Sequence, residues 1–218
     1  MGRLFVVPGG PWNHESFRGG FEFTTRKKSH HWATIKIGII LVAVTPMLVR
    51  GSGQKMLRES FERIQKGLVR EAKLLYGRRL ISIVLYGSVA RGTQRFDSDL
   101  DCLLVCKDLP KGRMKRIKEF ERVEDSLGSL LGDLKKKGVR ITFSPILKTP
   151  EEVERGSPIF LDMVEDALIL HDKDDFFASR LARLRERLSA LGAKRIWRGN
   201  AWYWDLKPDF RPGEIFDL

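Results

Sequence analysis

The sequence predicts an α+β fold in which a mixed β-sheet is flanked by helices. Three observations support this prediction. In several segments apolar residues recur every three or four positions, as they do along one face of a helix. Between these segments lie short apolar runs rich in β-branched residues, which suit buried strands. Glycines stand at the junctions, where helices end and turns begin.

The first half of the regular region is predicted to run helix, strand, short helix, strand. A helical face begins at Met56 and ends at Gly77. Its apolar positions are Leu57, Phe61, Ile64, Leu68, Ala72 and Leu75. Residues 80–86 are typical of a buried strand, and residues 100–106 are typical of another. The segment between them, residues 87–99, is small, polar and charged, and it is expected to hold the functional loop.

The second half continues the alternation and ends in an aromatic tail. The remaining predicted elements are a long helix over 114–134, a strand over 139–147, helical residues 150–166, a short strand over 167–170 and a last helix over 181–191. These boundaries predict one domain over 56–171, with a C-terminal helix and an extended aromatic tail over 172–218 packed on it. The aromatics of the tail are expected to hold it to the domain, and stacking on bases is the alternative.

Composition limits the class of protein. With 218 residues, the chain has room for one full domain and an appendage. Hydrophobic residues make up 42% and charged residues 31%, which excludes general disorder and a polytopic membrane protein. The net charge of +12 fits a polyphosphate or nucleic-acid ligand, although a solvated surface explains it equally well. The scarcity of Asn and Gln, five in all, suggests a thermophile.

The two cysteines indicate the compartment. Cys102 and Cys106 share one predicted strand and have no zinc-like spacing, so they form neither a disulfide framework nor a metal site. They are most simply core residues of a protein in a reducing interior, and a cytoplasmic location is expected.

Residues 1–55 differ in composition and apolar pattern from the rest of the chain, and three interpretations of them remain open. They hold an apolar stretch at 32–49 whose uncharged core is 13 residues long, whereas a bilayer span needs about 20. The segment is an extension outside the folded domain, with the true start at Met47 or Met56, or a single membrane anchor, or an extra element packed on the domain. The Gly-Ser-Gly sequence at 51–53 is expected to break the chain before the domain.

The chemistry is expected in the loop that follows the first predicted strand. Gly87 lets the backbone pass close to a phosphate, because glycine has no Cβ in the way. The amides after it, at the start of a short helix, favour an anion. The Ser88 hydroxyl is a donor to a phosphate oxygen, and Arg91, about one turn further on, adds a charge-assisted bond.

Two carboxylates at the head of the next strand complete the predicted site. Asp99 and Asp101 are two residues apart, so both point to the same face of a strand. Neighbouring carboxylates repel unless a cation lies between them, and Mg²⁺ combines one or two carboxylates with substrate phosphates and water. The sequence therefore predicts a nucleoside triphosphate held between a glycine turn and a metal site. Asp97 has the same parity but is expected to lie in the loop.

The order Gly87-Ser88, ten residues, then Asp99-Leu100-Asp101 resembles the nucleotidyltransferase superfamily that includes DNA polymerase β. More narrowly, it is similar to the small prokaryotic minimal nucleotidyltransferases. The resemblance implies that a nucleotidyl group, expected to be AMP, moves from an NTP, expected to be ATP, to a hydroxyl on a protein or small molecule. It also implies two Mg²⁺ ions on Asp99 and Asp101, with phosphate on Gly87 and Ser88. The ending at 202–210 resembles a tail found on small archaeal members.

The same resemblance implies partners. Some minimal members are antitoxins that adenylylate a small helical toxin, so a small helical protein is an expected partner. Nucleic acid is less expected, because the 163 residues from Met56 leave little room for RNA-gripping domains. A membrane enters only if residues 32–49 form an anchor.

One departure from the family pattern opens a second hypothesis. Members usually carry a third carboxylate on the later strand, where it helps deprotonate the attacking hydroxyl. Here that strand, residues 139–147, holds no Asp or Glu, and Thr142 or Ser144 is expected at the position. The alternative function is therefore a nucleotide-binding module with weak or no catalysis that covers a partner in the manner of an antitoxin. Pro145 predicts that this strand is an edge or has a bulge.

Overall fold

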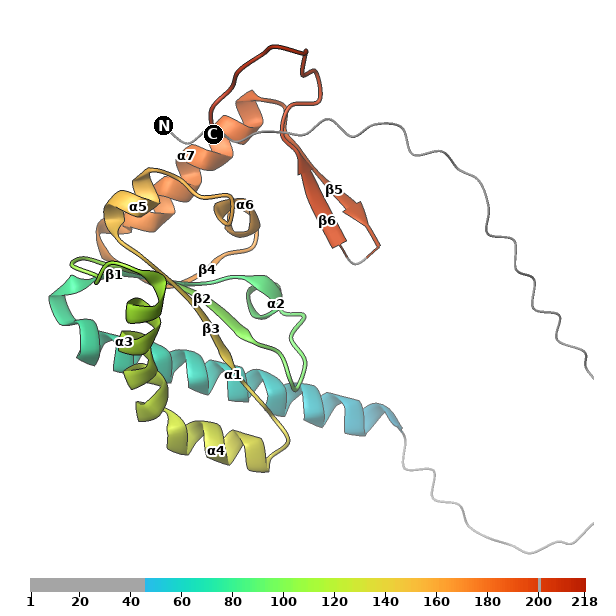
Figure 1. Ribbon diagram of the computed structural model, residues 1–218. Coiled ribbons are helices and arrows are strands. Elements are labelled where there is room, and N and C mark those ends of the chain that lie inside the picture. The colour runs from blue at the N-terminus through green and yellow to red at the C-terminus, as the bar shows by residue number, and fades with distance from the viewer. Residues whose placement is uncertain (1–45, 200) are drawn as a thin grey trace, which may run out of the picture. The chain divides into compact units, whose positions relative to one another are not determined.

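The computed structural model describes residues 46–199 and 201–218, and it has a four-stranded mixed sheet covered on both faces by helices (Figure 1). The sheet strands are β1 (Leu80–Leu85), β2 (Leu100–Cys106), β3 (Phe143–Lys148) and β4 (Leu168–Asp172). The α-helices are α1 (Pro46–Tyr76), α2 (Gly87–Ala90), α3 (Arg113–Ser126), α4 (Gly128–Lys136), α5 (Pro150–Glu154), α6 (Phe160–Met163) and α7 (Phe176–Ala190). Short 3₁₀ turns are η1 (Gly77–Arg79) and η2 (Lys173–Asp175).

The strand order β3-β2-β1-β4 agrees with the predicted mixed sheet. β1 pairs antiparallel with both β2 and β4, whereas β2 pairs parallel with β3. As predicted from Pro145, β3 lies at an edge, where a missing backbone N–H is tolerated. The parallel pairing sets Asp101 opposite Ser144.

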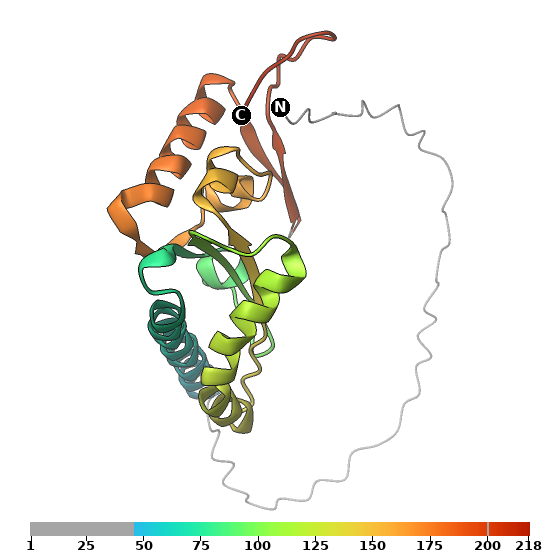
Figure 2. The same ribbon diagram turned by 60° about the vertical axis from the view of Figure 1, so that its left-hand side comes forward.

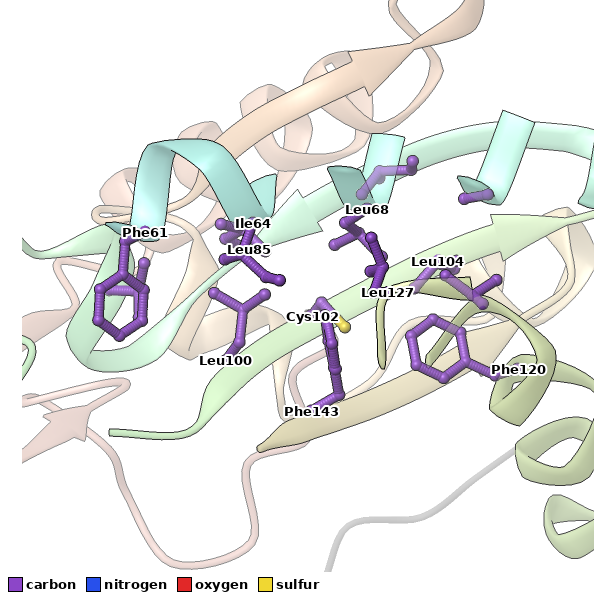
Figure 3. Packing of buried hydrophobic residues seen from close by; sticks show 14 of the residues in the cluster. Phe61, Ile64, Leu68, Leu85, Leu100, Cys102, Leu104, Phe120, Leu127 and Phe143 are labelled. Atoms are coloured by element: carbon purple, nitrogen blue, oxygen red, sulfur yellow. The ribbon is translucent and has the colours of Figure 1, made fainter. Parts of the chain in front are cut away.

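The first face of the sheet is covered by α1, α3 and α4, and Figure 3 shows the core on this face. Phe61, Ile64 and Leu68 of α1 are almost fully buried against Leu85, Leu100 and other strand residues, as the period of three to four predicts. Phe120 of α3 meets Phe143 edge to face, with the ring centroids 5.7 Å apart.

The second face is covered by α5, α6 and α7 (Figures 1 and 2). Phe160 of α6 and Phe177 of α7 meet edge to face, with the ring centroids 5.5 Å apart. At the end of β4, the Asp172 carboxylate accepts hydrogen bonds from the Ser82 hydroxyl at 2.6 Å and from the Ala178 amide at 2.9 Å. These bonds tie the start of α7 to the central strand.

The first helix begins earlier than predicted. The Gly-Ser-Gly sequence at 51–53 was expected to break the chain, but α1 starts at Pro46 and runs through it. Each helical glycine costs only about 1 kcal/mol, which the long packed helix from Met56 onward offsets. Residues 1–45, with most of the apolar stretch at 32–49, lie outside the described residues. No helix within the described ranges is long and apolar enough to cross a membrane.

The helix predicted over 114–134 is two helices that meet at Leu127. The bend lets Leu127 pack directly on α1 at Gly67, where a Cβ would lie 2.8 Å from Leu127 Cδ2. A side chain at residue 67 would have to be accommodated by moving Leu127. The helical segment predicted over 150–166 is likewise divided, into α5 and α6.

The sequence predicts an extended C-terminal tail. In the structure, part of this tail forms a β-hairpin. Strands β5 (Lys194–Arg198) and β6 (Ala201–Asp205) pair antiparallel as a separate two-stranded sheet (Figure 1). Trp204 and Leu206 pack against the second-face core. Trp197 of β5 and Trp202 of β6 are register partners with ring centroids 6.5 Å apart, and such cross-strand aromatic pairs stabilise an antiparallel ladder.

Candidate active site

The predicted acidic pair lies at the start of β2, and Asp101 projects to the second face of the sheet. Leu100 and Cys102 on either side of Asp101 belong to the first-face core, and Leu103 belongs to the second-face core. Because side chains alternate along a strand, Asp101 must point toward the second face. Asp99, in the exposed segment just before β2, has the same parity.

The structure brings the glycine turn against Asp101. The Tyr86 amide donates to the Asp101 carbonyl at 3.2 Å, so the chain leaving β1 runs beside the head of β2. Gly87 follows with φ of 72°, in the left-handed region that glycine adopts readily. A Cβ at Gly87 would lie 2.3 Å from Asp101 Oδ2, so a side chain at this position would require the Asp101 carboxylate to move. Glycine is therefore favoured here for two independent reasons.

Ser88 and Arg91 lie on and just after the one-turn helix α2. The loop folds back on α2 because the Thr93 amide and hydroxyl both donate to the Ser88 carbonyl, at 2.9 and 3.3 Å. Amides in the first turn of a helix have no acceptor within it, so those of α2 are available to an anion. The exposed Arg91 guanidinium is close enough to lower the pKa of Asp101.

The electrostatics of Asp101 fit a cation. Burial raises the pKa of Asp101 above its ordinary value, and the Asp99 charge raises it further. A hydrogen bond from the Ser144 hydroxyl and the positive charge of Arg91 oppose the rise in this pKa. Two neighbouring carboxylates with one pKa raised by the other are relieved by a divalent ion. The residues present therefore fit Mg²⁺, which needs few protein ligands when phosphates and water supply the rest.

The third-carboxylate position remains without an acid. Ser144 stands opposite Asp101 on β3, and it is exposed. Over residues 46–199 and 201–218, no group of three or more His, Cys, Asp or Glu side chains is placed to hold a metal ion. Any further ligands of an ion on Asp99 and Asp101 would come from the substrate or solvent.

One acid near the site was missed by sequence reasoning. Asp162, on α6, is half-buried, and its charge is among the causes that raise the pKa of Asp101. Burial raises the pKa of Asp162 itself, while Arg91 and Arg195 lower it. No local spacing connects Asp162 to the motif at 87–101, because only the packing of α6 on the second face brings them near each other.

Comparison with known proteins assigns the family. The family model described as the nucleotidyltransferase domain matches residues 65–171. A protein of Methanocaldococcus jannaschii, named Putative protein adenylyltransferase MJ1305, is 34% identical over 119 residues, which cover 54% of this chain and 76% of that protein. The chain therefore belongs to the nucleotidyltransferase family, and the resemblance seen in the sequence is confirmed.

Solved structures give a weaker likeness. A toxin–antitoxin crystal structure with AMP-PNP matches with a TM-score of 0.38 and 18% identity, covering 58% of this chain and 90% of that chain. A tri-AMPylated Shewanella oneidensis HEPN toxin in complex with MNT antitoxin matches with a TM-score of 0.32 and 16% identity, covering 63% and 90%. These scores are low, and the family assignment rests on the family model and the archaeal relative.

The close approach at Gly87 predicts a graded response to alanine. Gly92→Ala should cost about 1 kcal/mol of unfolding free energy, because Gly92 also has positive φ but its Cβ would meet nothing within 4 Å. Gly87→Ala should cost more, because its Cβ also displaces Asp101. Urea unfolding of both variants measures the difference. Equal losses would contradict the proposed steric role of Gly87.

The raised pKa of Asp101 predicts that this carboxylate destabilises the metal-free protein at neutral pH. A folded pKa above the unfolded value means that the ionised form costs stability once the pH exceeds the folded pKa. Asp101→Asn should therefore raise Tm at pH 7 in EDTA, and its advantage should shrink as the pH falls toward about 4, the unfolded pKa.

Asp97→Asn is the matched control, because Asp97 is an exposed loop carboxylate in the same segment. Its Tm should equal that of the unaltered protein across the pH range. If the Tm of Asp101→Asn at pH 7 is at or below that of Asp97→Asn, other interactions offset the cost of burying the Asp101 charge, and the prediction is wrong.

Proposed function

We propose that the chain transfers AMP from ATP, in the presence of Mg²⁺, to a hydroxyl group of a protein. The observation that supports this most directly is the close approach of the Gly87 turn to the Asp101 carboxylate, because it brings the backbone proposed to bind phosphate next to a carboxylate proposed to bind the metal. Membership of the nucleotidyltransferase family gives the reaction type. The name of the archaeal relative, a protein adenylyltransferase, favours AMP and a protein acceptor.

In this proposal each residue of the loop has one role. The Ser88 hydroxyl and the α2 amides bind phosphate oxygens of the triphosphate, and Arg91 adds a positive charge beside them. Asp99 and Asp101 hold Mg²⁺, which would neutralise charge on the triphosphate as pyrophosphate leaves. The acceptor oxygen forms a bond to the α-phosphorus while the bond from that phosphorus to the bridging oxygen breaks, so that pyrophosphate leaves and the hydroxyl proton passes to water. The chain's contribution is to orient the α-phosphate for this in-line displacement.

The acid pair is tested by label transfer. Asp99→Asn combined with Asp101→Asn should reduce transfer from ATP labelled at the α-phosphate into protein acceptors by at least about 100-fold, because the charge that holds the metal is lost. Asp97→Asn should transfer label normally. ATP labelled only at the γ-phosphate should label nothing, because that phosphate leaves with pyrophosphate. Undiminished transfer by the double variant would overturn the assignment of Asp99 and Asp101.

A second candidate function is supported by Ser144. With a hydroxyl where the family usually has an acid, turnover would be slow, and the chain would act as a nucleotide-binding module that covers a small helical partner. Binding of Mg-ATP without pyrophosphate release would favour this candidate. Rapid pyrophosphate release would favour the transferase.

The two candidates predict different effects of restoring the acid. Ser144→Asp sets a carboxylate directly opposite Asp101 at an exposed position, where it does not disturb the core. If the missing acid limits the rate, pyrophosphate release should rise by about 100-fold, the lower end of what a general base contributes. Ser144→Asn introduces a side chain of the same size as Asp but without its charge. This variant is the control and should give no increase in the rate of pyrophosphate release. An unchanged rate in Ser144→Asp would show that the third acid is not limiting.

A further inference from the structure

The C-terminal hairpin has two chemically different faces. Arg195 pairs with Trp204, and Trp197 pairs with Trp202, so these four side chains share one face of the hairpin, called here the inner face. Ile196 and Tyr203 form a pair on the opposite, outer face, where Arg198 stands over the Tyr203 ring.

The base of the inner face is fixed to α6. The Trp204 indole Nε1 donates to the Leu161 carbonyl at 3.2 Å. Arg195 Nη2 donates to the Asp166 carboxylate, just after α6, at 2.7 Å, and both side chains of this ion pair are largely buried. The hairpin is therefore held with its inner face turned toward α6, and Figures 1 and 2 both show it beside that helix.

Part of the inner face, at Trp197, is not covered by this packing on α6. Trp197 keeps 54% of its surface exposed. The Arg195 guanidinium lies 4.8 Å from the Trp197 ring centroid and 4.3 Å from that of Trp202. Arg195 Nε is buried without a hydrogen-bond partner among the described residues. Trp197, Trp202 and Arg195 are called here the tryptophan platform.

The platform and the acid pair belong to the same face of the main sheet. Asp101 projects to the second face, and α6, which holds the hairpin, packs on that face. Asp162 of α6 connects the two regions electrostatically, because its pKa responds both to Arg91 of the site and to Arg195 of the platform. The exposed indole of Trp197 is therefore a planar aromatic surface on the face of the sheet that also carries Asp101.

We propose that the tryptophan platform holds the base of the nucleotide by stacking. The proposal rests on the proposed function, because it requires the triphosphate to lie at Gly87 and Ser88. A flat ring matches the exposed part of the Trp197 indole, and the Arg195 guanidinium beside that ring adds a cation–π attraction.

The test compares two ligands that differ only in the nucleoside. Mg-ATP and Mg-tripolyphosphate are titrated calorimetrically into the full-length chain. Trp197→Ala should weaken ATP binding by roughly tenfold or more, as loss of one stacked base does. The same variant should bind tripolyphosphate as the unaltered protein does, because the phosphates are held elsewhere. Trp197→Phe, which keeps an aromatic face, should restore most of the affinity for ATP.

Tyr203→Ala is the matched control, because Tyr203 is an exposed aromatic of the same hairpin on its outer face. It should leave the affinity for both ligands unchanged. The platform is refuted if Trp197→Ala binds ATP normally, if it weakens both ligands equally, or if the unaltered protein binds ATP no more tightly than tripolyphosphate. If the unaltered protein binds neither ligand, the proposed function itself fails.

Discussion

The site depends on one steric constraint, the absence of a side chain where the chain leaving β1 passes Asp101. A Cβ at Gly87 would overlap the Asp101 carboxylate, at 2.3 Å from Oδ2. The positive φ of the same residue turns the chain into α2 and so aims the α2 amides. If either condition failed, the turn at Gly87 and the Asp101 carboxylate could not both keep these positions. The proposed chemistry therefore depends on two strands whose ends meet at a single glycine.

Because side chains alternate along β2, the two faces of this strand differ: one packs in the first-face core and the other presents Asp101. Leu100, Cys102 and Leu104 face α1 and the first-face core, where burial is nearly complete. Asp101 faces the other way, toward the elements on which the proposed nucleotide chemistry takes place. A register slip of one residue would bury the acid and expose the core residues, so the packing of α1 also fixes which face carries the chemistry.

Local signals predicted the parts of the structure that a short segment determines. The strand-turn-strand sequence from Val84 to Asp101 contained the glycine turn, the one-turn helix and the acid pair in order, and the structure brings Gly87 and Asp101 together. Pro145 correctly predicted an edge strand. Asp162 and the tryptophan platform could not be predicted from local sequence, because only the packing of α6 and of the hairpin brings them to the second face of the sheet.

The errors also have physical causes. The glycines at 51 and 53 predict a break that the structure does not show, because a long packed helix extends through them. The hairpin had a usable sequence signal, the Gly199-Asn200 dipeptide between Trp197 and the aromatic run at 202–204. Its strands are only five residues long, so their alternation is weak as evidence without the tertiary contacts of Trp204.

The proline in β3 has a consequence for how copies of the protein meet. A strand at the border of a sheet can recruit a strand from another molecule, which leads to uncontrolled self-association. With Pro145 in this border strand, the ladder of backbone donors that such recruitment uses is incomplete. Pro145 therefore disfavours pairing of a neighbouring copy along β3, the strand that carries Ser144.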